Sequence, residues 1–191
     1  MPWLRRSDRL PALPAQVREG LALRRGERLL AHAQRLDGGW VIATSAALVL
    51  VDPVDGPLKG PGTPSERRWW HDVADATWDP DTSSFAIRWA DGSPSSSLAL
   101  SEPVANLPQV LRERVMSTFV LSQRVPVRGR RGVTVAVRRH AVDGTLFMQQ
   151  VPDDGVNLTR AAVADQVAAL TRDLAEQAGL PPDVRSAPET C

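Results

Sequence analysis

The feature that most constrains the fold is a change in the spacing of apolar residues near position 106. Residues 28–100 consist of short extended runs that end at glycine, proline, aspartate or serine. From Leu107 the apolar residues instead recur every three or four positions, which places them on one face of a helix. Several short strands followed by one amphipathic helix predict an α+β fold in which the helix covers an open end of the β region.

Seven strands are predicted in the β region, at residues 28–36, 40–44, 46–51, 67–71, 73–79, 84–89 and 95–100. We expect them to wrap into a seven-stranded closed barrel or a sandwich. The helix is expected over residues 107–122, with Leu111, Val115 and Phe119 facing the interior. Prolines and glycines crowd residues 52–66, so we expect a mobile loop there.

A β-hairpin and a second helix are predicted after this unit. Strands are expected at residues 124–127, 132–142 and 145–151, with Asp143-Gly144 as a two-residue hairpin turn. That turn would place Arg138 opposite Gln149 and His140 opposite Phe147. Apolar residues at helical spacing predict a helix over residues 159–178, which Gly179 would cap.

The chain therefore divides into four predicted parts. These are an N-terminal arm with a short helix (1–23), a barrel domain with its covering helix (24–122), a strand, hairpin and helix (123–180), and a tail (181–191). The third part has neither a disulfide nor a metal to stabilise it, and it is small, so we expect it to dock on the barrel.

Targeting signals are not evident in the sequence. The longest apolar run, Val41 to Val51, is far shorter than the roughly 20 residues of a membrane-spanning helix. The first residues lack the apolar stretch of a signal peptide. The single cysteine, Cys191, excludes an internal disulfide. We therefore expect a cytoplasmic protein without a transmembrane segment.

Charge is balanced over the whole chain but uneven along it. Residues 1–35 and 106–139 are basic, whereas residues 66–105 and 140–191 are acidic. Every basic residue except Lys59 is arginine, which is typical of a high-GC bacterial genome. Oppositely charged segments of this kind often face one another in the folded chain.

Arginines gather most densely around a glycine-flanked loop that precedes a predicted strand. Guanidinium groups bind phosphate oxygens through paired hydrogen bonds, so this cluster is a candidate anion-binding site. The alternative is an ordinary solvated surface that partly neutralises the acidic last helix. The candidate residues are Arg128, Arg130, Arg131 and Arg138.

Two adjacent tryptophans stand out among the five that fall in the predicted barrel. On one strand, Trp69 and Trp70 would point to opposite faces, so one of them would point outward or be covered by another part of the chain. An outward tryptophan beside His71 would anchor a partner. Trp69, Trp70 and His71 are therefore the candidate partner-contact residues.

Catalytic and metal-binding groups have weaker support. His71 and Asp75 would share a face of a strand, which leaves a metal enzyme or hydrolase as a third alternative, although two ligands do not complete a metal site. The serines around Pro94 lack a nucleophile elbow, and terminal Cys191 lacks a positioned base. We therefore expect no catalytic residue, no cofactor and no metal.

The order of elements resembles the pleckstrin-homology superfold. Three segments look like its bacterial and GRAM-like members, namely residues 26–30, the hairpin at 40–50, and residues 68–73. The resemblance covers about residues 24–122, and the whole chain is similar to uncharacterised actinobacterial proteins. Phosphoinositide-binding members carry basic residues around the first loop, whereas residues 37–40 here are acidic or neutral. The resemblance thus implies a scaffold for protein contacts or for weak contact with an anionic surface.

These observations predict a non-catalytic cytoplasmic binding or adaptor module whose partner is a protein. The alternative is an anion-binding module that contacts nucleic acid or an anionic membrane surface through the arginine-rich loop.

Overall fold

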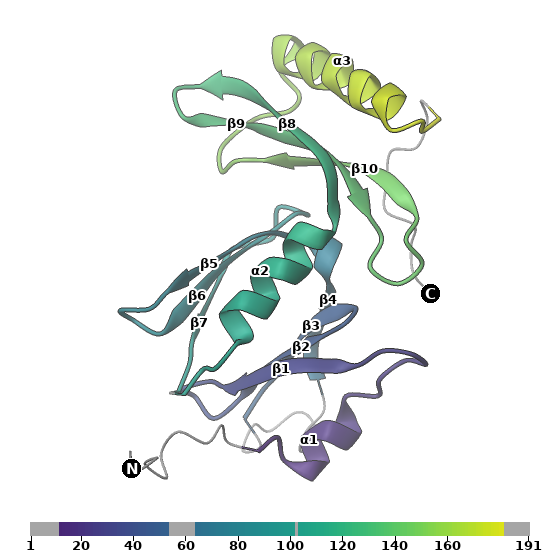
Figure 1. Cartoon of the computed structure of the whole chain (residues 1–191). Helices are drawn as coiled ribbons and strands as arrows, with labels where there is room; N and C mark the ends of the chain where they lie inside the picture. The colour runs from purple at the N-terminus through teal and green to yellow at the C-terminus, as the bar shows by residue number, and fades with distance from the viewer. Residues whose placement is uncertain (1–11, 54–63, 102, 182–191) are drawn as a thin grey trace, which may run out of the picture.

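The computed structural model describes residues 12–53, 64–101 and 103–181 (Figure 1). It has a mixed α+β fold with three antiparallel sheets and three α-helices. The central part of the predicted loop at 52–66 and nearly all of the predicted tail lie outside the described residues, as do residues 1–11 of the N-terminal arm. The predicted fold class, α+β, is confirmed.

The first seven strands form two sheets. The first sheet has the order β1-β2-β3-β4, with β1 at Leu29–Gln34, β2 at Trp40–Thr44, β3 at Ala47–Val51 and β4 at Pro64–Trp69. The second has the order β5-β6-β7, with β5 at Val73–Asp79, β6 at Ser84–Trp89 and β7 at Ser96–Ala99.

The central strands β2 and β3 are buried at every position, because both faces of the first sheet are covered. On one face Val41 and Leu48 pack in a core shared with the second sheet and the second helix. On the other face Ile42 and Val49 pack against Val17 of α1 (Ala15–Gly20). This double coverage explains why both strands are apolar throughout.

The seven strands do not close into a barrel, so that part of the prediction is wrong. In the described part of the chain, β4 and β5 share no hydrogen-bonded ladder. The first and second sheets contact each other where β1 and β7 end. There Leu36 N donates to Ala99 O (3.0 Å), beside an isolated bridge between Arg35 and Leu100. The reason is the 3-10 turn η2 (Trp70–Asp72), which bends the chain out of the first sheet into the second.

Helix α2 (Leu107–Ser117) lies against the second sheet in Figure 1, and its buried residues Leu111 and Val115 join the shared core. The helix ends five residues before the predicted end. Thr118 Oγ1 donates to Val115 O (2.6 Å), and a strand begins at the next residue. Phe119 therefore lies on a strand, although it still packs against the core.

The remaining strands form a third sheet with the order β10-β9-β8. Its strands are β8 at Phe119–Arg128, β9 at Arg131–Arg139 and β10 at Leu146–Pro152. Helix α3 (Ala161–Gln177) covers one face of this sheet, as Figure 1 shows. Gly179 adopts φ +68 after the helix, and Leu180 N donates to Ala175 O (2.8 Å), as the predicted glycine cap requires. The predicted boundary at 122/123 falls inside β8.

The hairpin between β9 and β10 has a different register from the predicted one. Arg138 pairs with Phe147, two residues from the expected partner Gln149. Asp143-Gly144 is not a two-residue turn, because His140 N donates to Thr145 O (2.8 Å) and closes a longer loop over residues 141–144. A shift of two residues leaves every side chain on its predicted face.

Candidate functional site

The predicted partner-contact residues lie at the junction of the first and third sheets. Trp69 ends β4 and is half-buried beneath the Arg24 guanidinium, 4.6 Å from the ring centroid. Trp70 and His71 belong to η2 and are only 1% and 2% exposed. Trp70 Nε1 donates to Thr44 O (2.9 Å), which fixes this ring in the core. Neither Trp70 nor His71 offers a surface contact, because the chain leaves the strand between Trp69 and Trp70.

The third sheet covers His71. Gln149 Nε2 donates to His71 O (3.0 Å), and the His71 ring lies 4.7 Å from the His140 ring and 5.2 Å from the Phe147 ring. Burial, followed by electrostatic interactions with His140 and Arg138, lowers the pKa of His71 to about 4. His71 is therefore neutral at pH 7.

The structure does not bring His71 and Asp75 together as a ligand pair. His71 is buried in the η2 turn, whereas Asp75 is exposed on β5. Among the described residues, no group of three or more histidine, cysteine, aspartate or glutamate side chains has a metal-binding arrangement. The turn at η2 removes the regular alternation on which the shared-face expectation depended.

Arg138 is separated from the other three arginines of the predicted anion site. It is fully buried, and its Nη2 donates to Trp70 O and Val73 O, each at 3.1 Å. Its guanidinium lies 3.8 Å from the centroid of the Phe119 ring, and burial lowers the pKa of Arg138 to about 10. Arg138 therefore joins the third sheet to η2 and does not belong to an exposed anion site.

The other three arginines lie on the turn between β8 and β9. Arg128, Arg130 and Arg131 are exposed, and none forms an ion pair within the described residues. Asp153 binds Arg124 instead, and Arg124 also donates to Arg130 O (2.7 Å). The acidic last helix therefore supplies no ion-pair partner to this basic hairpin tip in the described part of the chain.

Sequence reasoning missed a groove between β5 and α2. The groove has a volume of about 630 Å³. Met116 is 60% exposed at the α2 side of the groove, and β5 is an edge strand, since within the described residues it pairs only with β6. The only sequence signal is Met116 itself, an apolar residue next to the buried face of the helix. The lining residues are Asp75, Ala76, Thr77 and Trp78 from β5, and Pro108, Gln109, Arg112, Val115 and Met116 from α2.

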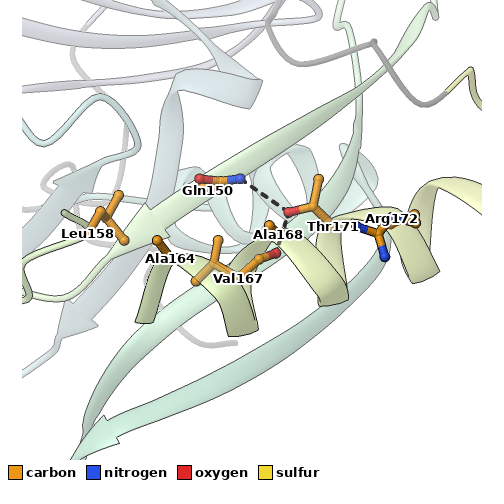
Figure 2. Close-up of a pocket in the computed structure, with 7 residues that line it drawn as sticks. All are labelled: Gln150, Leu158, Ala164, Val167, Ala168, Thr171 and Arg172. Carbon is orange, nitrogen blue, oxygen red and sulfur yellow. Dashed lines mark hydrogen bonds between the residues drawn. The ribbon is translucent and has the colours of Figure 1, made fainter. Parts of the chain in front are cut away.

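A smaller pocket of about 290 Å³ lies between β10 and α3 (Figure 2). Ala164 and Ala168 keep the helix side shallow, and Leu158 lies at one end. Gln150 Nε2 donates to Thr171 Oγ1 (3.1 Å) across the pocket, and Thr171 Oγ1 in turn donates to Val167 O (2.7 Å). Gln150 and Thr171 are therefore already hydrogen-bonded, which makes this pocket a weaker candidate than the β5–α2 groove.

Comparisons with known proteins identify no relative: no family model, no curated protein and no solved structure matches this chain. Among the helices in the described part of the chain, none has the length and apolar character needed to cross a membrane. The functional argument therefore depends on the surfaces described above.

Proposed function

We propose that this chain is a non-catalytic binding module that holds an extended segment of a protein partner in the groove between β5 and α2. The observation that carries this proposal is the free edge of β5 along the groove. An edge strand presents unpaired main-chain N–H and C=O groups, and an extended peptide can pair with them as an added strand.

The side chains of β5 suit this mode of binding. They alternate regularly, with Ala76 and Trp78 half-buried toward the core and Asp75, Thr77 and Asp79 exposed. A peptide added in register would alternate in the same way. Its inward side chains would contact the groove wall near Met116, and its outward side chains would lie beside the carboxylates of Asp75 and Asp79 on β5.

Of the two charged residues that line the groove, Asp75 lies on β5 and Arg112 lies on α2, so the charge at the strand edge favours a basic partner segment. Asp75 accepts a hydrogen bond from Thr77 Oγ1 (2.9 Å) but forms no ion pair within the described residues. Opposite charges across neighbouring strands stabilise pairing, whereas like charges oppose it. We therefore infer a partner segment in which arginine or lysine alternates with apolar residues.

The predicted resemblance to pleckstrin-homology domains becomes part of this proposal. This resemblance is supported by the order of the elements. A four-stranded sheet is followed by a three-stranded sheet and then by a helix that packs in their shared core. The cytoplasmic location expected from the sequence belongs to the same proposal.

Selection of random peptides on the full chain tests the groove. We expect enrichment of extended peptides in which basic and apolar residues alternate. Binding should weaken at least about tenfold in Asp75→Lys and in Met116→Glu. The first change places a positive charge beside the basic side chains of the peptide, and the second places a negative charge beside its apolar side chains. Leu36→Glu is the matched control, since Leu36 is an exposed apolar residue outside the groove. Peptides that bind both groove variants as tightly as the unchanged chain would contradict the proposal.

A second candidate function is supported by the unneutralised hairpin tip. Arg128, Arg130 and Arg131 could bind nucleic acid or an anionic membrane surface, with an affinity that falls steeply as salt increases. The test measures binding to duplex DNA, RNA and anionic vesicles at two salt concentrations. The triple alanine variant should lose this binding. Unchanged binding in that variant, or no binding at low salt, would exclude the hairpin tip as the site.

A further inference from the structure

A separate crevice lies where the third sheet meets α2 and the turn between β2 and β3. This junction crevice has a volume of about 410 Å³, within the range of small-molecule sites. Its lining is mainly polar and comes from segments far apart in the sequence. The residues are Ser45, Trp70, Arg114, Ser117, Thr118, Arg139, His140, Ala141, Val142, Asp143 and Gly144.

Two guanidinium groups from different elements line the junction crevice. Arg114 is half-buried on α2, and Arg139 is exposed at the end of β9. Neither forms an ion pair within the described residues. Asp143 also lines the crevice, and its Oδ1 binds His140 Nδ1 (2.7 Å) and accepts a hydrogen bond from Thr145 N (2.9 Å) rather than binding either arginine. The two arginines are therefore available to an anionic ligand.

More basic groups lie on the other side of the 141–144 loop. A neighbouring cavity of about 280 Å³ shares Val142 with the junction crevice and is lined by Arg24 and Arg25. Its one carboxylate, Glu27, is occupied by Arg67 at 2.6 Å. Val142 is 49% exposed between the two cavities. An apolar residue that lines both of these arginine-containing cavities suits a ligand that has both an anionic group and a small apolar part.

We propose that the junction crevice binds the phosphate group of a small phosphorylated molecule. Arg114 and Arg139 hold the phosphate oxygens, and Val142 contacts the rest of the molecule. Guanidinium groups that approach from two elements can share the oxygens of a tetrahedral phosphate, and each can donate two hydrogen bonds. Ser45 Oγ accepts a hydrogen bond from Arg28 N (3.1 Å), so its O–H can donate to the same ligand.

This site is distinct from both surfaces discussed above. Arg131 begins β9 and Arg139 ends it, so the hairpin tip and the junction crevice are separated by roughly 25 Å of extended chain. The β5–α2 groove uses Arg112, which lines that groove and not the crevice. Variants of these other arginines therefore serve as controls.

The experiment titrates inorganic phosphate and phenyl phosphate into the full chain at low salt while backbone amide NMR signals are recorded. We expect the signals of residues 114–118 and 139–144 to move, and phenyl phosphate to bind more tightly because of Val142. In Arg114→Gln/Arg139→Gln the affinity for both probes should fall at least about tenfold, because two charge-assisted contacts are lost. Arg112→Gln and the hairpin variant Arg128→Gln/Arg130→Gln/Arg131→Gln should bind as the unchanged chain does.

Three results would overturn the proposal. The first is that neither probe moves the NMR signals of residues 114–118 and 139–144. The second is that the double variant binds the probes as tightly as the unchanged chain, and the third is that only the hairpin variant loses binding. Thermal unfolding shows whether the double variant remains folded. If it does not, Arg139→Gln gives the same test with an exposed residue.

Discussion

Nη2 of Arg138 lies 3.1 Å from the main-chain carbonyl oxygen of Trp70, and this hydrogen bond joins the third sheet to the turn between the first two. Arg138→Ala should lower the free energy of unfolding by about 3 kcal/mol, because it leaves a cavity and unpaired carbonyls. Arg138→Met should cost less, since it fills most of the volume and removes a buried charge. Denaturant unfolding measures both. Equal stability of Arg138→Ala and the unchanged chain would show that this contact does not hold the sheets together.

The buried His71 should make stability depend on pH between about 4 and 6.5. Its pKa is about 4 in the folded chain, against 6.5 for an ordinary histidine, so the unfolded chain binds more protons within this window. The free energy of unfolding should therefore fall as the pH decreases from 6.5 to 4, by up to about 3 kcal/mol. Burial raises the pKa of neighbouring Asp72, which acts in the opposite direction.

His71→Gln isolates the contribution of this histidine. Glutamine does not titrate, so denaturant unfolding between pH 7.5 and 4.5 should show a shallower pH dependence in the variant. The groups that face His71 are His140, Asp143, Arg138 and Asp72, and all of them remain in the variant. The same slope in both proteins would mean that another of these groups causes the effect.

The partly buried ion pair of Glu27 with Arg67 should also stabilise the folded chain. Burial alone would raise the pKa of Glu27, but hydrogen bonds from Arg67, Thr44 and the main chain outweigh it, so the pKa is lowered. Glu27→Gln should lower the free energy of unfolding at pH 7 by about 2 kcal/mol. The loss should shrink as the pH falls through the pKa of Glu27, where the native carboxylate also becomes neutral. Glu19→Gln, at an exposed glutamate on α1, is the control in the same unfolding assay.

Gly132 should be intolerant of a larger side chain. A Cβ atom there would lie 2.3 Å from Val125 O on the paired strand β8. Gly132→Ala should therefore lower the free energy of unfolding by about 2 kcal/mol, because the strands must separate. Ser122→Ala at an exposed position of β8 should change it little. Similar midpoints for the two variants in a denaturant titration would show that the hairpin adapts without strain.

Local patterns in the sequence identified most of the secondary structure. The predicted strands at 40–44, 73–79 and 84–89 coincide with β2, β5 and β6, because alternation and turn residues act over a few positions. Helix α3 and its Gly179 cap were also predictable from spacing alone. The errors at η2 and at the end of α2 have a different origin. There the chain direction depends on contacts with distant residues, such as Trp70 with Thr44.

The candidate sites were less predictable. A run of arginines indicates a solvated surface, and nothing in the sequence distinguishes Arg138, whose hydrogen-bond partners are main-chain carbonyls, from exposed Arg131. The β5–α2 groove and the junction crevice each combine elements that only the tertiary fold brings together. Sequence spacing carries no information about such combinations.

Thr118 alone separates α2 from β8. It is buried, its carbonyl oxygen accepts from Arg139 N at 2.7 Å, and its hydroxyl binds the preceding turn of the helix. Because a single hydrogen-bonded residue joins the two elements, their relative orientation is fixed. A displacement of α2 by a peptide in the groove would therefore reach β8 through this one residue, and Thr118 also lines the junction crevice.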